Sequence, residues 1–205
     1  MKTPSEHIIV IGRQYAAGGR QLGRLLAKRL GIPYYDKELL REAADSLGFR
    51  PDLFEMSDEK RPGRWASMLS ANYGASNYFT SGAMHGGTLY QMQSHAIRQL
   101  LEKGPCVVVG RTADYIGRDM ENLVSIFLHA DKGERVRRAL ERAPEMEGKD
   151  VASWLETLDN ERRDYYNYYT GRHWGHADNY DLCINTTSQP PEQTADIVEL
   201  FLKSR

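Results

Sequence analysis

Short runs of apolar residues, separated by longer amphipathic stretches, set the pattern of this chain. Five runs read as strands, and most of them are continuous rather than alternating, which is typical of strands that are covered on both faces. They lie at residues 8–11, 33–35, 106–109, 124–128 and 182–184. After the first run, Leu22, Leu26 and Leu30 follow the helical period, and Gly31 with Pro33 ends that helix.

The stretches between the other runs also read as helices. Their predicted ranges are 37–47, 88–103, 132–142, 150–169 and 192–203. Strands that alternate with helices predict an α/β fold with a doubly wound, five-stranded parallel sheet. Ligands in such folds bind beyond the carboxyl ends of the strands.

Two stretches interrupt this alternation. Residues 50–87 are rich in Ser, Gly, Asn, Tyr and Met and show weak periodicity. They are too long for an ordinary connection, so they predict either a small substrate-covering insert or a mobile loop. Residues 170–180 form a polar and aromatic loop before the last strand, where ligand contacts are expected.

A glycine-rich turn, residues 12–20, connects the first strand to the first helix and reads GRQYAAGGR. Glycines allow positive φ angles and let backbone N–H groups approach an anion, and the helix N-terminus adds roughly half a positive charge. The turn therefore predicts a phosphate-binding site. Its amides come from Ala17, Gly18, Gly19, Arg20 and Gln21. The alternative is a turn that only reverses the chain.

The strict phosphate-loop pattern G-x-x-x-x-G-K-[ST] fits this turn in no register. If Gly18 is the second glycine, Arg13 stands at the first glycine position. Gly19 and Arg20 then occupy the lysine and hydroxyl positions. If Gly19 is the second glycine, Arg20 takes the lysine position and Gln21 the hydroxyl position. We predict Arg20 as the phosphate-binding cation, because a guanidinium can donate two parallel hydrogen bonds to phosphate. The hydroxyl that normally holds magnesium is missing.

Charge and composition narrow the function classes. The 205 residues include 27 Lys+Arg and 28 Asp+Glu, for a net charge of −1, and 40% are hydrophobic. This balance is typical of a soluble globular domain and gives no general attraction to nucleic acid. No apolar run approaches the roughly 20 residues that cross a bilayer, and no secretory signal is visible. We therefore expect one cytoplasmic domain over residues 1–205, with Cys106 and Cys183 as buried thiols.

Four more segments combine with RQYAAGGRQLG to suggest a family. They read GIPYYDKELL, VVVGRTADYI, YYNYYTGRHWG and NYDLCINT. Together these motifs resemble the cytidylate kinase-like family of P-loop proteins, relatives of bacterial cytidylate kinase, over nearly the whole chain and least in residues 50–87. The resemblance implies the nucleoside monophosphate kinase fold, with a core, a monophosphate-binding region and a lid. It also implies transfer of the γ-phosphoryl group of ATP to a CMP-like acceptor, with Mg²⁺ bound through the nucleotide phosphates.

Arg162 is the sharpest candidate for phosphoryl transfer. At about 100° per residue it falls on the apolar stripe of helix 150–169, with Leu155 and Leu158. An arginine on such a stripe must find an anion or extend to solvent. The resemblance assigns phosphate contacts in a lid, residues 159–180, to Arg162, Arg163 and Arg172. The alternative is that these arginines pair with neighbouring carboxylates, Asp159 among them, on a solvated helix face.

Candidates on the acceptor side end two predicted strands. Arg111 follows a buried strand, and the resemblance implies that it binds the acceptor phosphate. Asp114 either binds the base or sugar of the acceptor or caps the next helix. Asp36 matches an acidic residue near the acceptor in the resembled kinases, and it also fits the N-cap of helix 37–47. The resemblance assigns an arginine of helix 132–142 to the donor or lid side. We select Arg138 for this role and expect the other arginines of the helix on a solvated face.

The sequence thus predicts a nucleoside monophosphate kinase-like enzyme that uses ATP and Mg²⁺ with a pyrimidine monophosphate. One alternative is a nucleotide-binding regulatory protein that lost catalysis; another is a kinase with a different small acceptor. His173 and His176 lack a third ligand, so no metal site is predicted there. Neither a nucleic acid nor a membrane is an expected partner.

Overall fold

Five parallel strands form a single sheet in the order β2-β3-β1-β4-β5. The computed structural model describes residues 3–38, 40, 45, 48 and 86–205, and of residues 86–89 only their place in a helix. The strands are β1 (Ile8–Arg13), β2 (Tyr34–Tyr35), β3 (Cys106–Val109), β4 (Leu123–His129) and β5 (Leu182–Asn185). Each predicted apolar run is a strand, which confirms the α/β fold and its parallel sheet.

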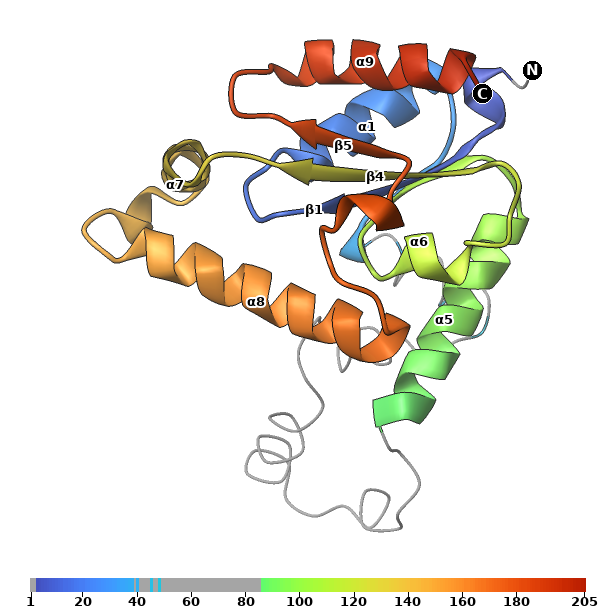
Figure 1. Ribbon diagram of the computed structural model, residues 1–205, viewed down its shortest axis with the longest axis horizontal. Coiled ribbons are helices and arrows are strands. Elements are labelled where there is room, and N and C mark those ends of the chain that lie inside the picture. Colours follow the sequence, from blue (N-terminus) through green and yellow to red (C-terminus); the bar gives the residue numbers. More distant parts are fainter. Residues whose placement is uncertain (1–2, 39, 41–44, 46–47, 49–85) are drawn as a thin grey trace.

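Alternate residues of β1 serve opposite faces of the sheet. Ile9 and Ile11 belong to the core cluster formed with α1 (Gly19–Leu30) and α9 (Pro191–Lys203). Ile8 and Val10 belong to the cluster formed with α5 (Gly86–Glu102) and α6 (Ala113–Ile116). Figure 1 shows α1 and α9 on one side of the sheet and α5 and α6 on the other. The sheet is therefore doubly wound, and its central strands are buried on both faces because each face carries helices.

The first helix begins where the glycine-rich turn ends. Gly18, the N-cap of α1, has a φ of 89°, in the left-handed region that favours glycine. Farther along the helix, a Cβ atom at Gly23 would lie 2.8 Å from the Tyr34 ring and 3.0 Å from a Val109 methyl carbon. Glycine at this position lets α1 approach β2 and β3 closely, which sets the helix N-terminus beside the carboxyl end of β1.

Two further helices cover the carboxyl ends of the strands. They are α7 (Lys132–Arg142) and α8 (Val151–Thr170), joined through the short 3-10 helix η2 (Pro144–Met146). Figure 1 shows α7 beyond the tips of the β4 and β5 arrows, with α8 running back below the sheet. Ala16 of the turn packs in a buried cluster with Ala139, Val151 and Leu155. The pair α7–α8 therefore supports the glycine-rich turn directly.

The remaining predictions have mixed outcomes. Residues 37, 38, 40 and 45 are helical, within the predicted helix 37–47, while residues 50–85 of the predicted insert lie outside the described residues. The short 3-10 helices η1 (Pro4–Glu6) and η3 (Ala177–Asn179) were not predicted, and helix α6 was implied only as the helix that Asp114 would cap. In the described ranges, no helix combines the length and the apolar character that a membrane span requires.

The prediction of two buried thiols is half wrong. Cys106 is buried on β3, an interior strand of the sheet, and burial raises its pKa to about 12. Cys183 is exposed. The reason is that β5 ends the strand order, so one of its edges and part of its face remain open to solvent.

Candidate functional site

The first turn of α1 presents free backbone donors. The amide of Ala17 donates to the Gln14 carbonyl oxygen at 3.3 Å, and the amide of Leu22 donates to Gly18 at 2.9 Å. Between them, the amides of Gly18, Gly19, Arg20 and Gln21 donate to no protein group among the described residues. Unsatisfied N–H groups at a helix N-terminus, together with the helix dipole, form an anion-binding site.

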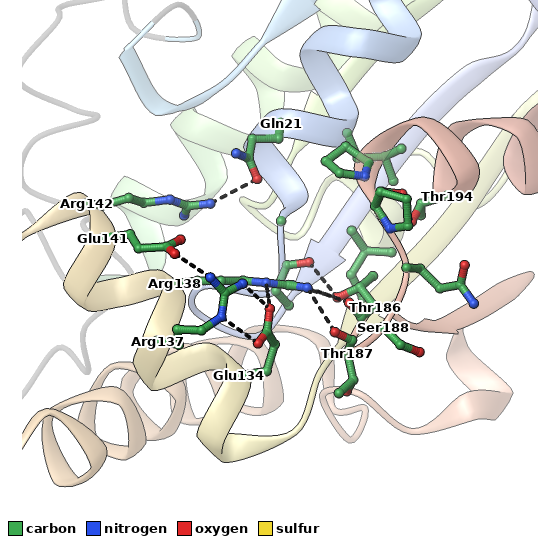
Figure 2. Close-up of a pocket in the computed structure, with 17 residues that line it drawn as sticks. Gln21, Glu134, Arg137, Arg138, Glu141, Arg142, Thr186, Thr187, Ser188 and Thr194 are labelled. Carbon is green, nitrogen blue, oxygen red and sulfur yellow. Dashed lines mark hydrogen bonds and ion pairs between the residues drawn. The ribbon is translucent and has the colours of Figure 1, made fainter.

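A cavity of about 470 Å³ opens beside this helix end. Figure 2 shows its walls: the start of α1, the arginines of α7, and the chain that follows β5. We call it the larger cavity. Ala17, Gly18 and Gln21 form its floor on the α1 side, and residues 186–191 form the opposite wall. Its volume is in the range of small-ligand sites.

Arg138 joins two walls of the larger cavity. Its Nη2 donates to the carbonyl oxygen of Thr186 at 2.6 Å, and its Nε donates to Glu134 at 2.7 Å. Arg137 also pairs with Glu134, and these two guanidinium groups lower the pKa of the Glu134 carboxyl to about 2. Arg142 reaches across the cavity to the Gln21 side chain at 3.0 Å. Figure 2 shows these side chains projecting from α7 toward α1 and the chain after β5.

A smaller cavity, of about 20 Å³, lies where β1 and β3 end. Three arginines from three separate elements line it: Arg13 at the end of β1, Arg111 just after β3, and Arg162 on α8. The rest of the lining is Gly12, Gly110, Thr112, Asp114, Tyr165, Tyr166, Trp174 and Tyr180. The predicted candidates Arg111, Asp114 and Arg162 are thus brought together, although they are far apart in the sequence.

The backbone that presents Arg111 is strained. Gly110, Arg111 and Thr112 have φ angles of 83°, 62° and 53°. A non-glycine residue in this region costs on the order of 1–3 kcal/mol, so two in succession require support from their surroundings. Such strain is concentrated at functional sites, and here it holds the Arg111 side chain, 3% exposed, at the smaller cavity.

Asp114 places a buried carboxyl in the same cavity. It accepts a hydrogen bond from the Tyr166 hydroxyl at 2.7 Å. Burial raises the pKa of this carboxyl, and the Tyr166 hydrogen bond and the charge of Arg172 only partly oppose that shift. Asp114 is not the N-cap of α6, which is Thr112. It lies inside the first turn, where its carboxyl accepts hydrogen bonds from its own backbone amide and from that of Tyr115.

Asp159 connects α8 to the glycine-rich turn. Its carboxylate, 4% exposed, accepts from the Tyr15 amide at 2.7 Å and pairs with Arg135 at 2.5 Å. Arg162 Nη1 lies 3.5 Å from the same carboxylate. The predicted pairing of Arg162 with Asp159 therefore exists, but on a buried face rather than a solvated one.

The prediction that the other arginines of α7 lie on a solvated face is wrong for Arg135. That arginine is buried, whereas Arg137 is exposed and pairs with Glu134 and Glu141 as a solvated face would. The sequence analysis did not identify Asp159 as the buried partner of Arg135. The helical period offered a signal, because Asp159 follows Leu155 by four residues and so lies on the same apolar stripe of α8.

Other candidates lie outside both cavities. Arg20 pairs with Glu38 at 3.2 Å, and both side chains are more than half exposed. The carboxylate of Asp36 is buried, 3.4 Å from Arg24 and 3.3 Å from the Tyr34 hydroxyl. Burial, together with that carboxylate, raises the pKa of Tyr34 to about 12. The roles proposed for Arg20 and Asp36 stay predictions.

Of the three lid candidates, Arg162 lines the smaller cavity, whereas Arg163 and Arg172 have other contacts. Arg163 is exposed and donates to Asn160 at 2.7 Å, while Arg172 lies over the Tyr115 ring, 5.3 Å from its centroid. Neither residue lines the larger or the smaller cavity, so their phosphate contacts stay predictions. In the part of the chain that is described, no group of three or more His, Cys, Asp or Glu side chains is arranged to hold a metal ion.

The comparisons with known proteins agree with this architecture. The model of the cytidylate kinase-like family matches residues 8–188. An uncharacterized protein from Eubacterium ventriosum has a similar structure, with a TM-score of 0.73, 29% identity, and coverage of 98% of this chain and 99% of its own.

More distant structures share the fold alone. A shikimate kinase from Bacteroides thetaiotaomicron is 15% identical with a TM-score of 0.53, covering 96% of this chain and 98% of its own. A gluconokinase from Sinorhizobium meliloti is 16% identical with a TM-score of 0.52, covering 97% of this chain and 93% of its own. None of the curated proteins compared with the sequence matches it.

Proposed function

The chain belongs to the cytidylate kinase-like family, and from this premise we propose that it transfers the γ-phosphoryl group of ATP to a pyrimidine nucleoside monophosphate such as CMP. One observation carries the proposal: Arg111 and Arg162 converge on one small cavity at the carboxyl ends of β1 and β3. Phosphoryl transfer depends mainly on positioning and on positive charge around the migrating group. Arginines that converge on one point from separate elements supply both the positioning and the positive charge.

The donor nucleotide fits the larger cavity. Its phosphates would accept hydrogen bonds from the amides of Gly18, Gly19 and Arg20 at the start of α1. The base would lie between the α7 arginines and residues 186–190. Arg138, tied to the Thr186 carbonyl, fixes the distance between these two walls.

We assign the acceptor phosphate to the arginines of the smaller cavity, which must widen to admit it. Arg111 and Arg162 would bind its oxygens, and Asp114 with Tyr166 would offer hydrogen bonds to the base or sugar. A volume of about 20 Å³ holds little more than one water molecule, so the acceptor enters only if the predicted lid, residues 159–180, moves outward. Its return would exclude water during transfer.

The step balances without a general base. The bond between the γ-phosphorus and the β–γ bridging oxygen breaks, and a bond to a phosphate oxygen of the acceptor forms. A monophosphate dianion has no proton to lose, so ADP and the nucleoside diphosphate are the only products. Bound Mg²⁺ supplies positive charge to the nucleotide phosphates. Arg20 stands at the hydroxyl position if Gly18 is the second glycine, so we propose that the ion arrives on the nucleotide without a side-chain ligand.

A coupled assay of ADP release across nucleoside monophosphates tests the proposal. We expect the highest kcat/KM with CMP or another pyrimidine monophosphate. Absence of turnover with every acceptor, in protein shown to be folded by circular dichroism, would reject it. Retained ATP binding in calorimetry, indifferent to Mg²⁺, would then favour the nucleotide-binding regulatory protein instead.

A different acceptor is the second candidate, and Asp114 is the observation in its favour. A hydroxyl acceptor must lose a proton on transfer, and a buried carboxyl with a raised pKa is suited to receive it. The acceptor panel therefore includes shikimate and gluconate, the hydroxy acids named for the two kinases of similar fold. If only these hydroxy acids are turned over, the acceptor is a hydroxy acid and not a pyrimidine monophosphate.

The donor site has its own test. Ser188 is exposed and lines the larger cavity, so Ser188→Tyr places a ring in the space assigned to the base. We expect ATP affinity to fall at least tenfold, about 1.4 kcal/mol, with an unchanged melting temperature. Gln193→Tyr is the matched control, because Gln193 is also exposed and does not line the cavity. If the two variants bind ATP with equal affinity, the larger cavity does not hold the base of the donor.

A further inference from the structure

The start of α1 decides which register of the phosphate-loop pattern applies. Gly18 is the N-cap and Gly19 is the first residue of the helix. In the pattern G-x-x-x-x-G-K-[ST], the second glycine leads into the helix and the lysine follows it at once. Gly18 is therefore the second glycine, Gly19 occupies the lysine position, and Arg13 stands where the first glycine belongs.

The side chain of Arg13 fills the space that a lysine at position 19 would need. A Cβ atom built on Gly19 would lie 2.9 Å from Cγ of Arg13, 3.2 Å from its Cβ and 3.3 Å from its Cδ. Real Cβ contacts essentially never fall below 3.0 Å. The stem of Arg13 thus crosses the first turn of α1, and its path requires glycine at position 19. The two departures from the pattern depend on each other.

Arg13 connects the helix start to the smaller cavity. It lines that cavity with Arg111 and Arg162, and its stem lies against Gly19 at the start of α1. Its backbone is held as the last residue of β1, in register with Leu128 of β4. Arg20, the cation that the sequence predicted, pairs with Glu38 and lines neither cavity.

We propose that Arg13 replaces the missing phosphate-loop lysine and binds the oxygens of the transferred phosphoryl group from the opposite side of the turn. The inference rests on the proposed function and names one of its phosphate-binding residues. A guanidinium is always charged and offers a planar set of donors, so it can contact two phosphate oxygens where an ammonium acts as a point charge. The altered turn then retains a cation at the site in spite of the lost lysine.

A swap of the two positions provides the test. In Arg13→Ala we expect kcat to fall about 100-fold, as for removal of one donor to a developing anion, and ATP affinity to fall about tenfold. In Arg13→Ala/Gly19→Lys the lysine regains its space, and we expect at least a tenfold recovery of kcat. Gly19→Lys alone should lose activity, because its side chain meets the Arg13 stem. Arg29→Ala is the control, since Arg29 lies at the end of α1 in ion pairs with Asp196 and Glu199.

The outcomes separate this inference from the proposed function. An active wild type with an equally active Arg13→Ala variant would overturn the inference and leave the function standing. A wild type that binds ATP without turnover would reject the function, and the ATP dissociation constants would then decide the inference alone. A wild type that binds no ATP would overturn both. Failure of the double variant to recover, in protein with an unchanged melting temperature, would overturn the lysine replacement.

Discussion

The carboxylate of Asp159 accepts a hydrogen bond of 2.7 Å from the backbone amide of Tyr15. The two residues are 144 positions apart in the sequence, one on α8 and the other in the glycine-rich turn. The same carboxylate pairs with the buried Arg135 of α7. The turn that is proposed to bind the donor phosphates is therefore fixed by the helix that carries Arg162, so displacement of α8 would disturb both substrates' sites.

Asp159→Asn tests how much this connection contributes to folding. Asparagine can still accept from the Tyr15 amide, but it leaves the Arg135 guanidinium buried without a counter-charge. Breaking a buried ion pair in this way costs about 3–5 kcal/mol in the free energy of unfolding. Urea denaturation measures the loss. Glu156→Gln is the matched control: Glu156 pairs with Lys132 with both side chains about half exposed, so its loss should cost less than about 1 kcal/mol. Similar losses in the two variants would contradict a buried role for Asp159.

Two glycine-to-alanine changes inside helices should have opposite signs. Gly23→Ala puts a Cβ atom 2.8 Å from the Tyr34 ring, so we expect a loss of about 1–3 kcal/mol through overpacking between α1 and the sheet. Gly133→Ala in α7 meets nothing within 4 Å and should stabilise by about 0.5–1 kcal/mol through helix propensity. Thermal and urea unfolding of both variants check the pair. A stabilising Gly23→Ala would mean that α1 does not approach β2 and β3 as closely as described.

The raised pKa of Asp114 predicts a pH dependence of stability. Between the ordinary carboxyl value of 3.8 and the raised native value, the native state holds a proton that the unfolded state has lost. Stability therefore falls as pH rises through that window and then levels off. Asp114→Asn removes the ionisation and keeps an acceptor for the Tyr166 hydroxyl. We expect its unfolding free energy, relative to wild type, to grow from about pH 4 upward in urea denaturation. A difference that does not vary with pH would contradict a charged, desolvated Asp114.

The sheet was predictable because each strand is a local pattern. Runs such as residues 106–109 are continuous and apolar, and in an α/β chain this pattern indicates strands that are buried on both faces. The same holds for Arg162, which the helical period placed on an apolar stripe beside Leu155. An arginine on such a stripe must find an anion or extend to solvent, and the structure supplies Asp159.

The residues that the sequence analysis missed have partners on other elements of the fold. Arg135 looked like its solvated neighbour Arg137, and only the packing of α7 on α8 distinguishes them. The sequence analysis did not select Arg13 as a phosphate-binding residue, because its contact with Gly19 depends on how the turn folds back over α1. Arg20 was chosen by its position in the motif, and its side chain leaves the turn toward Glu38.

Arg162→Ala distinguishes catalysis from structure on α8. Asp159 keeps Arg135 and the Tyr15 amide when Arg162 is removed, so we expect only a small change in melting temperature. The expected fall in kcat is about 100-fold, with a smaller change in KM, because an arginine at the smaller cavity acts mainly on charge that develops during transfer. Arg162→Lys should recover only part of kcat, since it keeps the charge and loses the planar donors.

Arg163→Ala, at an exposed position one residue along, should lower kcat less than Arg162→Ala does. An equal fall in kcat would support the predicted lid role of Arg163. A collapse of stability in Arg162→Ala, with kcat retained in the folded fraction, would make the arginine a structural partner of Asp159.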